Sequence, residues 1–320
     1  MSQGGSPLFR GPVNSLRRFL RERVCGRGSD PFATDLGGID IRPQALDTAR
    51  GLRGTDRDGA IVLLGVMPRS GTVYTGELIR LHPQVHAYPY DLWEIPFLEL
   101  TGDLLAAQEK FFKLYRFNRD KMGQCDMLPL FGAAFLAYLH SGIPTGKTLL
   151  IKNPDMAYLR YFPAVFPYER LVLLLRDGRD LVHSTVKTWP EKSFAQTCRL
   201  WQRSTRLALE YAQRCGPGDR CLLAKYEDVV ADPRGFVRTL CTTFGLNENS
   251  FPFEAIDTLP MRGSSSLKKD GKVSWDPVEP EHRRSTTQHW LSWDRRRRDI
   301  FKRIAGDTLI EAGYADDLEW

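Results

Sequence analysis

Cysteine is scarce in this sequence and long apolar runs are absent, and each shortage excludes a class of protein. The chain has 6 cysteines among 320 residues, with no C-x-x-C pair and no cysteine–histidine spacing typical of a metal site. We therefore expect reduced structural thiols, no metal centre and a cytoplasmic location. The longest apolar stretches, "AIVLLGVM" and "LVLLL", are far too short to span a membrane, and the N-terminal residues lack the apolar core of a signal peptide. No transmembrane segment is predicted.

The composition supports a large core and an anionic ligand. Hydrophobic residues make up 42% of the chain, and the formal net charge is +6. The charge favours anionic ligands or surfaces. A basic nucleic-acid-binding protein is one alternative, supported by "RRRRD" at 295–299. Neither an aromatic platform nor a recognition helix accompanies those charges, so we expect no nucleic-acid partner.

Short apolar runs alternate with helical patterns from residue 60 onward. Five runs have the composition of buried strands: 60–66, 84–89, 147–152, 170–176 and 220–226. Helices are expected at 72–81, across 96–138 with a break at 122–129, at 182–189, at 194–215 and at 295–314. This alternation predicts a three-layer α/β fold around a central parallel sheet of about five strands.

The chain is predicted to form one domain, residues 59–320, after an N-terminal extension. Residues 1–58 are rich in Gly, Arg, Pro and Asp and show no strand pattern. Within them, "SLRRFLRERV" (15–24) can form a basic amphipathic helix. A solvated arm packing on the domain is favoured over a membrane-surface contact for this extension. The sheet pattern fades after residue 245, and about 258–320 is predicted to be a C-terminal cap.

The stretch "GVMPRSGT", Gly65 to Thr72, joins an apolar strand to a helix. Backbone N–H groups and the positive end of the helix dipole make such a turn an anion site. Compared with the phosphate loop G-x-x-x-x-G-K-[ST], Ser70 replaces the second glycine, Gly71 replaces the lysine, and Thr72 keeps the hydroxyl. The missing lysine disfavours a P-loop nucleotide kinase or NTPase. Arg69 supplies the positive charge instead.

A second strand–turn–helix, "RLVLLLRDGRDLVHSTVKTW", carries Arg176 at the strand end and Ser184 eight positions later. A guanidinium offers a planar fork of donors to a phosphate. Ser184 shares a helix face with Asp180 and Lys187. The pattern predicts a second phosphate site, and a structural Arg176–Asp180 ion pair is the alternative.

"PRSGT" with the following "HP" at 82–83 resembles the phosphosulfate loop of sulfotransferases that use 3′-phosphoadenosine 5′-phosphosulfate (PAPS) and release 3′-phosphoadenosine 5′-phosphate (PAP). The likeness extends over most of residues 60–293 and is closest to the tyrosylprotein and bacterial branch. Val73 departs from it, because many members have a threonine there. The resemblance implies a 5′-phosphosulfate site at Arg69, Ser70, Gly71 and Thr72 and a 3′-phosphate site at Arg176 and Ser184.

Two further stretches resemble nucleotide contacts of the same family. "KYEDVVADP" places Tyr226 where the family has a tyrosine against the adenosine, although a ring at the edge of the core is an equal alternative. "LPMRGSSS" resembles the loop that closes over the nucleotide, which implies phosphate contacts from Ser264 and Ser265 and added charge from Arg262 and two lysines at 268–269. A plain loop is the alternative there.

Sulfuryl transfer to a hydroxyl requires in-line placement, positive charge on the reacting oxygens and a base for the acceptor's proton. Arg69 is one predicted cation. Lys152, in "LLIKNPD" at a strand's carboxyl end, is the second, because open α/β sheets bind ligands there and the tyrosylprotein branch has a lysine in a similar setting. No metal is required.

The resemblance also implies a carboxylate base shortly after "HP". The matching spacing falls on Tyr90, and we predict the adjacent Asp91, with Glu94 and then His86 as alternatives. A base should be partly desolvated, and Trp93 with its neighbouring prolines is expected to provide that wall. A helix-capping role for Asp91 is equally favoured.

The acceptor stays open at this stage. The segment 93–144 contains "LWEIPFLEL", "FFKLYRF" and "FGAAFLAYL", which is enough apolar and aromatic surface to wall a pocket. A small molecule, a lipid, a glycan or a peptide tyrosine can each supply the hydroxyl.

Overall fold

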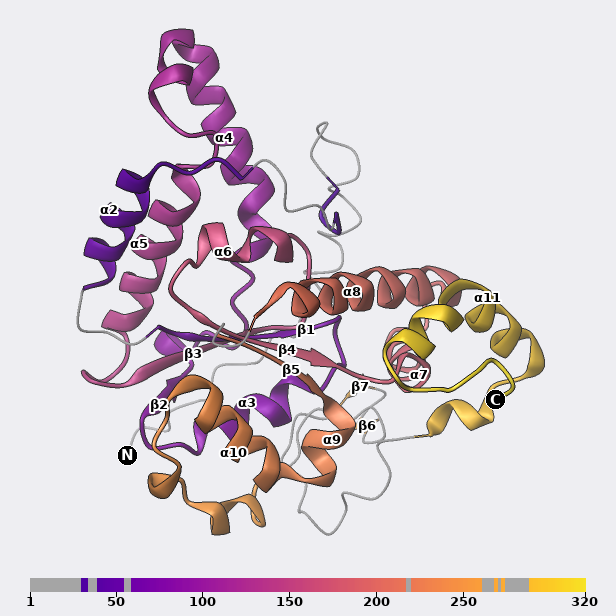
Figure 1. Cartoon of the computed structure of the whole chain (residues 1–320). Helices are drawn as coiled ribbons and strands as arrows, with labels where there is room; N and C mark the ends of the chain where they lie inside the picture. Colours follow the sequence, from indigo (N-terminus) through magenta and orange to yellow (C-terminus); the bar gives the residue numbers. More distant parts are fainter. Residues whose placement is uncertain are drawn as a thin grey trace, which may run out of the picture. The chain divides into compact units, whose positions relative to one another are not determined.

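A parallel five-stranded sheet forms the centre of the protein, in a computed structural model that describes residues 30–33, 39–54, 59–216, 220–260, 268–269, 272–273 and 288–320. The strands are β1 (Ile61–Gly65), β2 (Val85–Ala87), β3 (Thr148–Asn153), β4 (Arg170–Leu175) and β5 (Cys221–Lys225). Their order is β2-β3-β1-β4-β5 (Figure 1). Each strand matches one of the five predicted runs, with β3 extending one residue beyond its run, so the predicted sheet is confirmed.

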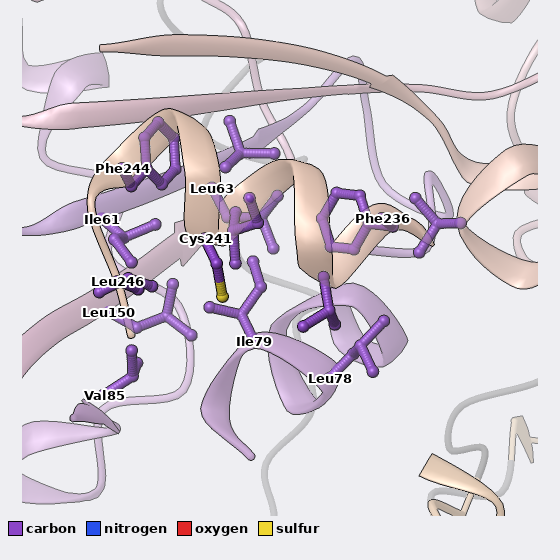
Figure 2. Close-up of a cluster of buried hydrophobic side chains, with 14 of the residues drawn as sticks. Ile61, Leu63, Leu78, Ile79, Val85, Leu150, Phe236, Cys241, Phe244 and Leu246 are labelled. Carbon is purple, nitrogen blue, oxygen red and sulfur yellow. The ribbon is translucent and has the colours of Figure 1, made fainter. Parts of the chain in front are cut away.

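The central strands are apolar because helices cover both faces of the sheet. All five residues of β1 and all six of β4 are buried. On one face, Ile61 and Leu63 of β1 pack with Leu78 and Ile79 of α3 (Thr72–Arg80) and with Phe236 of α10 (Pro233–Phe244), as Figure 2 shows. Figure 1 shows α9 (Tyr226–Ala231) on this side as well.

A second group of helices lies on the opposite face (Figure 1). They are α2 (Pro43–Arg53), α4 (Thr101–Leu114), α5 (Met127–Ser141), α6 (Phe162–Val165) and α8 (Phe194–Arg214). A break inside 96–138 is confirmed, but it lies earlier than the predicted 122–129, because α4 ends at Leu114 and α5 begins at Met127. Within the described ranges, no helix has both the length and the apolarity needed to cross a membrane.

Helix α2 was not predicted, because the residues it buries are small or charged. Its inward face is Ala45, Ala49 and Arg53. The guanidinium of Arg53 lies 2.7 Å from Glu169 Oε1, and the hydroxyl of Tyr168 donates to a carbonyl of α2 at 3.0 Å. Residues 43–53 therefore pack on the α/β fold, while the boundary predicted at residue 58 stays a prediction.

Two further helices, α7 (Gly178–Thr188) and α11 (Arg295–Glu311), both pack against α8 (Figure 1). The remaining described elements are short: 3₁₀ helices at Pro89–Asp91 (η2), Leu98–Leu100 (η3), Arg116–Lys121 (η4), Leu159–Tyr161 (η5), Glu248–Ser250 (η6), Phe253–Ile256 (η7) and His289–Ser292 (η9), and the antiparallel pair β6 (Lys268–Lys269) and β7 (Lys272–Val273). Ser264, Ser265 and Arg262 lie outside the described residues, as does segment 15–24.

Candidate active site

The loop between β1 and α3 is a tight turn that its own side chains hold together. The hydroxyl of the fully buried Ser70 donates to the carbonyl of Met67 at 2.6 Å and accepts from the N–H of Met67 at 3.2 Å. Arg69 has φ 82° and Gly71 has φ 97°, both in the left-handed region. The first N–H groups of α3 have no intrahelical acceptor and lie just beyond this turn, so the predicted anion site has the required backbone.

Gly71 is required by a close approach as well as by its backbone angle. A Cβ at this position would lie 2.1 Å from Cδ2 of Tyr226. No lysine can therefore stand where a nucleotide-hydrolysing loop carries one. The departure from the phosphate-loop motif that the sequence shows at position 71 is a steric consequence of the fold.

The two predicted anion loops touch each other. Strands β1 and β4 are neighbours in register, with Gly65 opposite Leu174, so their carboxyl ends meet at one edge of the sheet. There the Nε of Arg69 donates to Ser184 Oγ at 3.2 Å, and Nη1 of Arg176 donates to the carbonyl of Arg69 at 2.7 Å. The turn after β1 and the pair on β4 and α7 thus form one site.

Two guanidinium groups make this site strongly electropositive. Burial, and then the nearby charge of Arg176, lower the pKa of Arg69 to about 10. The Cζ of Arg176 lies 4.7 Å from the ring centroid of Tyr226, so the ring supports the guanidinium. An anion that enters between them gains from both charges and relieves their mutual repulsion.

Tyr226 is the first residue of α9 and is only 3% exposed. Its ring packs edge-on against Tyr74 of α3, with 6.5 Å between centroids, and against the backbone at Gly71. The structure therefore shows the ring buried beneath both anion loops. The predicted contact with an adenosine stays a prediction.

Asp180 is bound to the backbone of the C-terminal region. Its carboxylate accepts from the N–H of Gln288 at 2.6 Å and from the N–H of His289 at 2.7 Å. These bonds attach the start of η9 to the helix that carries Ser184. Asp180 therefore has a structural role through backbone hydrogen bonds, which differs from the role in an ion pair with Arg176 considered above.

Lys152 is a buried cation at the carboxyl end of β3, and only 3% of it is exposed. Its Nζ makes no hydrogen bond to any described residue, lies 4.6 Å from the ring centroid of Trp93, and is 4.0 Å from Glu94 Oε1. Burial lowers the pKa of Lys152 to about 8, against the opposing charges of Glu94 and then Glu77. A buried ammonium with unused donors is suited to an incoming anion.

Glu94 is the carboxylate beside this lysine. Burial raises its pKa above the ordinary value of a glutamate, and the charge of Lys152 opposes that shift. The next residue, Ile95, donates its N–H to the carbonyl of Lys152 at 3.0 Å, which attaches this loop to β3. Glu94, a carboxylate base, and Lys152, an ammonium acid, thus lie beside each other, and both are partly removed from water.

The other two predicted bases lie elsewhere. Asp91 is exposed in η2, with φ 59°. His86 pairs in register with Leu149, and strand alternation then places it on the face of the sheet opposite to Lys152. The burial expected of Asp91 is found at Glu94 instead. The backbone has positive φ at Tyr88, Tyr90 and Asp91, so the chain turns there before it returns to β3.

The sequence analysis did not predict that two carboxylates, Asp155 and Glu99, interact near the carboxyl end of β3. Burial, and then the charge of Glu99, raise the pKa of Asp155 to about 7. Asn153 Nδ2 donates to Glu99 Oε1 at 2.9 Å. The "KNPD" sequence, whose first two residues end β3, was the available signal. Among the described residues, no cluster of three or more His, Cys, Asp or Glu side chains is arranged to hold a metal ion.

The described cysteines in the core behave as structural thiols. Cys198 and Cys241 are buried, and burial raises their pKa values to about 12 and about 11. Such thiols are unreactive. The cytoplasmic location predicted from cysteine usage stays a prediction.

Two relatives of this chain are protein-tyrosine sulfotransferases. Protein-tyrosine sulfotransferase 1 of Danio rerio is 26% identical over 237 residues, which are 70% of this chain and 64% of that protein. The protein-tyrosine sulfotransferase of Drosophila melanogaster is 25% identical over 195 residues, 58% of this chain and 38% of that protein. The chain therefore spans less than two thirds of the length of either relative.

A solved structure and a family model complete the comparison. The sulfotransferase domain of the olefin synthase of Synechococcus PCC 7002 superposes with a TM-score of 0.50 at 18% identity, over 79% of this chain and 96% of that domain, which is a likeness of fold. The model of the sulfotransferase family matches residues 61–250, more than half of the chain. Because that match runs from β1 through η6 and includes both anion loops and Lys152, this chain belongs to the sulfotransferase family.

Proposed function

We propose that this protein transfers the sulfuryl group of PAPS to an acceptor hydroxyl and releases PAP. The observation that carries the proposal is the contact between the two anion loops through Arg69, Ser184 and Arg176. PAPS has a 3′-phosphate and a 5′-phosphosulfate on one ribose, so its two anionic groups need two cationic sites that lie close together. Binding would exchange the Arg69–Ser184 hydrogen bond for bonds to the ligand.

Within this proposal, each loop receives one end of the donor. The N–H groups at the start of α3, the Thr72 hydroxyl and Arg69 would hold the phosphosulfate. Arg176 and Ser184 would hold the 3′-phosphate. Ser70 has its hydroxyl engaged within the turn, so we assign it the shape of the loop rather than a direct contact.

Lys152, Arg69 and Glu94 would carry the chemistry. Bound PAPS supplies an electrophilic sulfur and a phosphate leaving group. Glu94 accepts the proton of the acceptor hydroxyl as the acceptor oxygen bonds to sulfur and the bridging S–O bond breaks. Lys152 and Arg69 stabilise the negative charge that develops on the sulfuryl and phosphate oxygens. In this scheme Asp91 remains the alternative base.

The pKa values of the pair suit these roles. A glutamate with a raised pKa is a stronger base than an ordinary carboxylate. Lys152, with a pKa of about 8, is mostly protonated at neutral pH, and a bound anion favours its charged form further. An ATP- or GTP-dependent reaction is disfavoured because Gly71 excludes the lysine that contacts β- and γ-phosphates.

The donor assignment predicts that the protein selects the 3′-phosphate. We expect PAP to bind at least about tenfold more tightly than 5′-AMP, because Arg176 offers charge-assisted hydrogen bonds that are each worth about 1.5–3 kcal/mol. In Arg176→Ala this preference should disappear. Isothermal titration calorimetry with both nucleotides measures it, and Arg234→Ala, at a surface ion pair with Asp257, is the matched control. Equal affinities for PAP and 5′-AMP in the wild type would contradict the proposal.

We further propose a phenolic hydroxyl as the acceptor. Tyr88 and Trp93 stack with 4.5 Å between ring centroids beside Lys152 and Glu94, which provides an aromatic wall for a ring. The two relatives described above are named for protein tyrosine. A phenol also loses its proton far more easily than an alkyl alcohol.

Labelled sulfuryl transfer to short peptides tests the acceptor. We expect a tyrosine-containing peptide to be sulfated and the same peptide with serine in its place to be inactive. In Trp93→Ala, the apparent KM for the tyrosine peptide should rise about two- to tenfold, since ring stacking contributes about 0.5–1.5 kcal/mol beyond buried area. Transfer to serine and not tyrosine would exclude a phenolic acceptor without affecting the donor assignment.

A further inference from the structure

The far end of α4 carries an exposed apolar patch that the proposed reaction does not use. We call residues 110–121, the last turn of α4 with η4, the α4 tip. The exposed fractions are 37% for Phe111, 77% for Leu114, 59% for Tyr115 and 57% for Phe117. In Figure 1 this end of α4 lies beyond α2 and α5, on the side away from the sheet.

These side chains are contiguous. Phe111 and Leu114 are spaced i and i+3, which places them on one face of the helix end, and Tyr115 follows directly as the extended residue after the helix. The rings of Tyr115 and Phe117 are 5.5 Å apart between centroids, which extends the face into η4. Phe112 points inward and is 1% exposed, so it anchors the segment while its neighbours stay outside.

Positive charge surrounds the patch. Residues 110–121 contain five basic side chains and one acidic side chain. Lys110, Lys113, Arg116 and Lys121 are exposed. The nearby Glu109 is paired with Arg119 at 2.8 Å, so it adds little negative potential. Apolar and aromatic groups with cations at their rim are the pattern of a segment that lies in the interface of an anionic membrane.

We propose that the α4 tip docks this protein on the surface of an anionic lipid bilayer. The composition of the patch favours a bilayer over a protein partner. Four apolar or aromatic side chains present on the order of 450 Å², and exposed lysine and arginine side chains surround them. Lysine is also depleted at protein interfaces, while it is favoured next to anionic headgroups. This inference goes beyond the proposed reaction and does not depend on it.

Vesicle co-sedimentation of the full chain tests the proposal. We expect binding to vesicles that contain about one third phosphatidylglycerol in phosphatidylcholine, little binding to pure phosphatidylcholine, and weaker binding at high salt. Leu114→Ser with Phe117→Ser should lower the partition coefficient about tenfold or more. Lys110→Glu with Lys121→Glu should lower it for the anionic vesicles while leaving the apolar face intact.

The matched control is Leu52→Ser with Leu291→Ser, which removes two leucines that are 49% and 54% exposed elsewhere on the described surface. This control should bind as the wild type does. Equal loss in the control and the tip variants, unchanged binding in both tip variants, or equal wild-type binding to neutral and anionic vesicles would overturn the proposal. A dimer in sedimentation velocity that the Leu114→Ser/Phe117→Ser variant abolishes would instead assign the patch to a second copy of the chain, and would also overturn it.

Discussion

Replacing Lys152 by alanine is expected to lower kcat by about 10²- to 10³-fold, the usual cost of removing one preorganised donor from a developing negative charge. Lys152 is buried, and its Nζ has no hydrogen-bond partner within the described part of the chain, so its donors are available to the reacting group. PAP carries no sulfuryl group, so its affinity should change much less than the rate. Single-turnover sulfuryl transfer and PAP titration separate the two effects.

Two further variants keep this experiment specific. Lys152→Arg retains the charge and should keep more activity than Lys152→Ala. Lys147→Ala removes an exposed lysine at the opposite end of β3 and should leave the rate unchanged. If Lys152→Ala folds, binds PAP and turns over within about threefold of the wild type, then the lysine has no role in stabilising the transition state.

Replacing Glu94 by glutamine is expected to lower kcat by about 10²- to 10⁴-fold, the range typical of a lost general base. The amide keeps the volume of the side chain but cannot accept the acceptor's proton. Asp91→Asn is the matched control, because Asp91 is an exposed carboxylate three positions earlier. Full loss in Asp91→Asn with a near-normal rate in Glu94→Gln would reverse the assignment of the base.

The pH profile gives this prediction a second readout. In the wild type, kcat/KM should rise as Glu94 loses its proton, above the ordinary pKa of a glutamate, and fall as Lys152 loses its proton near pH 8. In Glu94→Gln the rising limb should vanish. The falling limb should move to lower pH, because the charge of Glu94 raises the pKa of Lys152 and the variant removes that charge.

Much of the fold was predictable because burial on both faces leaves a strong pattern. Each of the five apolar runs became one strand, and the long amphipathic segment 194–215 became α8, Phe194–Arg214. Helix α2 escaped prediction because Ala45 and Ala49 form a thin apolar face and Arg53 is buried only through its contact with Glu169, far away in sequence. A buried charge that depends on a distant partner leaves no local signal.

The contact between the two predicted anion loops was predictable for a related reason. The carboxyl ends of parallel strands share one edge of a sheet, so loops that follow two neighbouring strands must meet. The choice of base was not predictable in this way. Counting from "HP" led to Asp91, whereas the burial expected of a base is found at Glu94. The reason is that the chain reverses its direction through residues with positive φ, and the N–H of Ile95 then bonds to a carbonyl of β3.

The sequence by itself determined the strand–helix alternation, the two strand–turn–helix loops and the glycine at position 71 in place of a lysine, since each depends on neighbouring residues or on a motif. The tertiary structure decided the strand order, the contact between Arg69, Ser184 and Arg176, and the burial that shifts the pKa values of Lys152 and Glu94. Desolvation and long-range contact are properties of the packed chain, because they depend on which distant segments exclude water from a side chain.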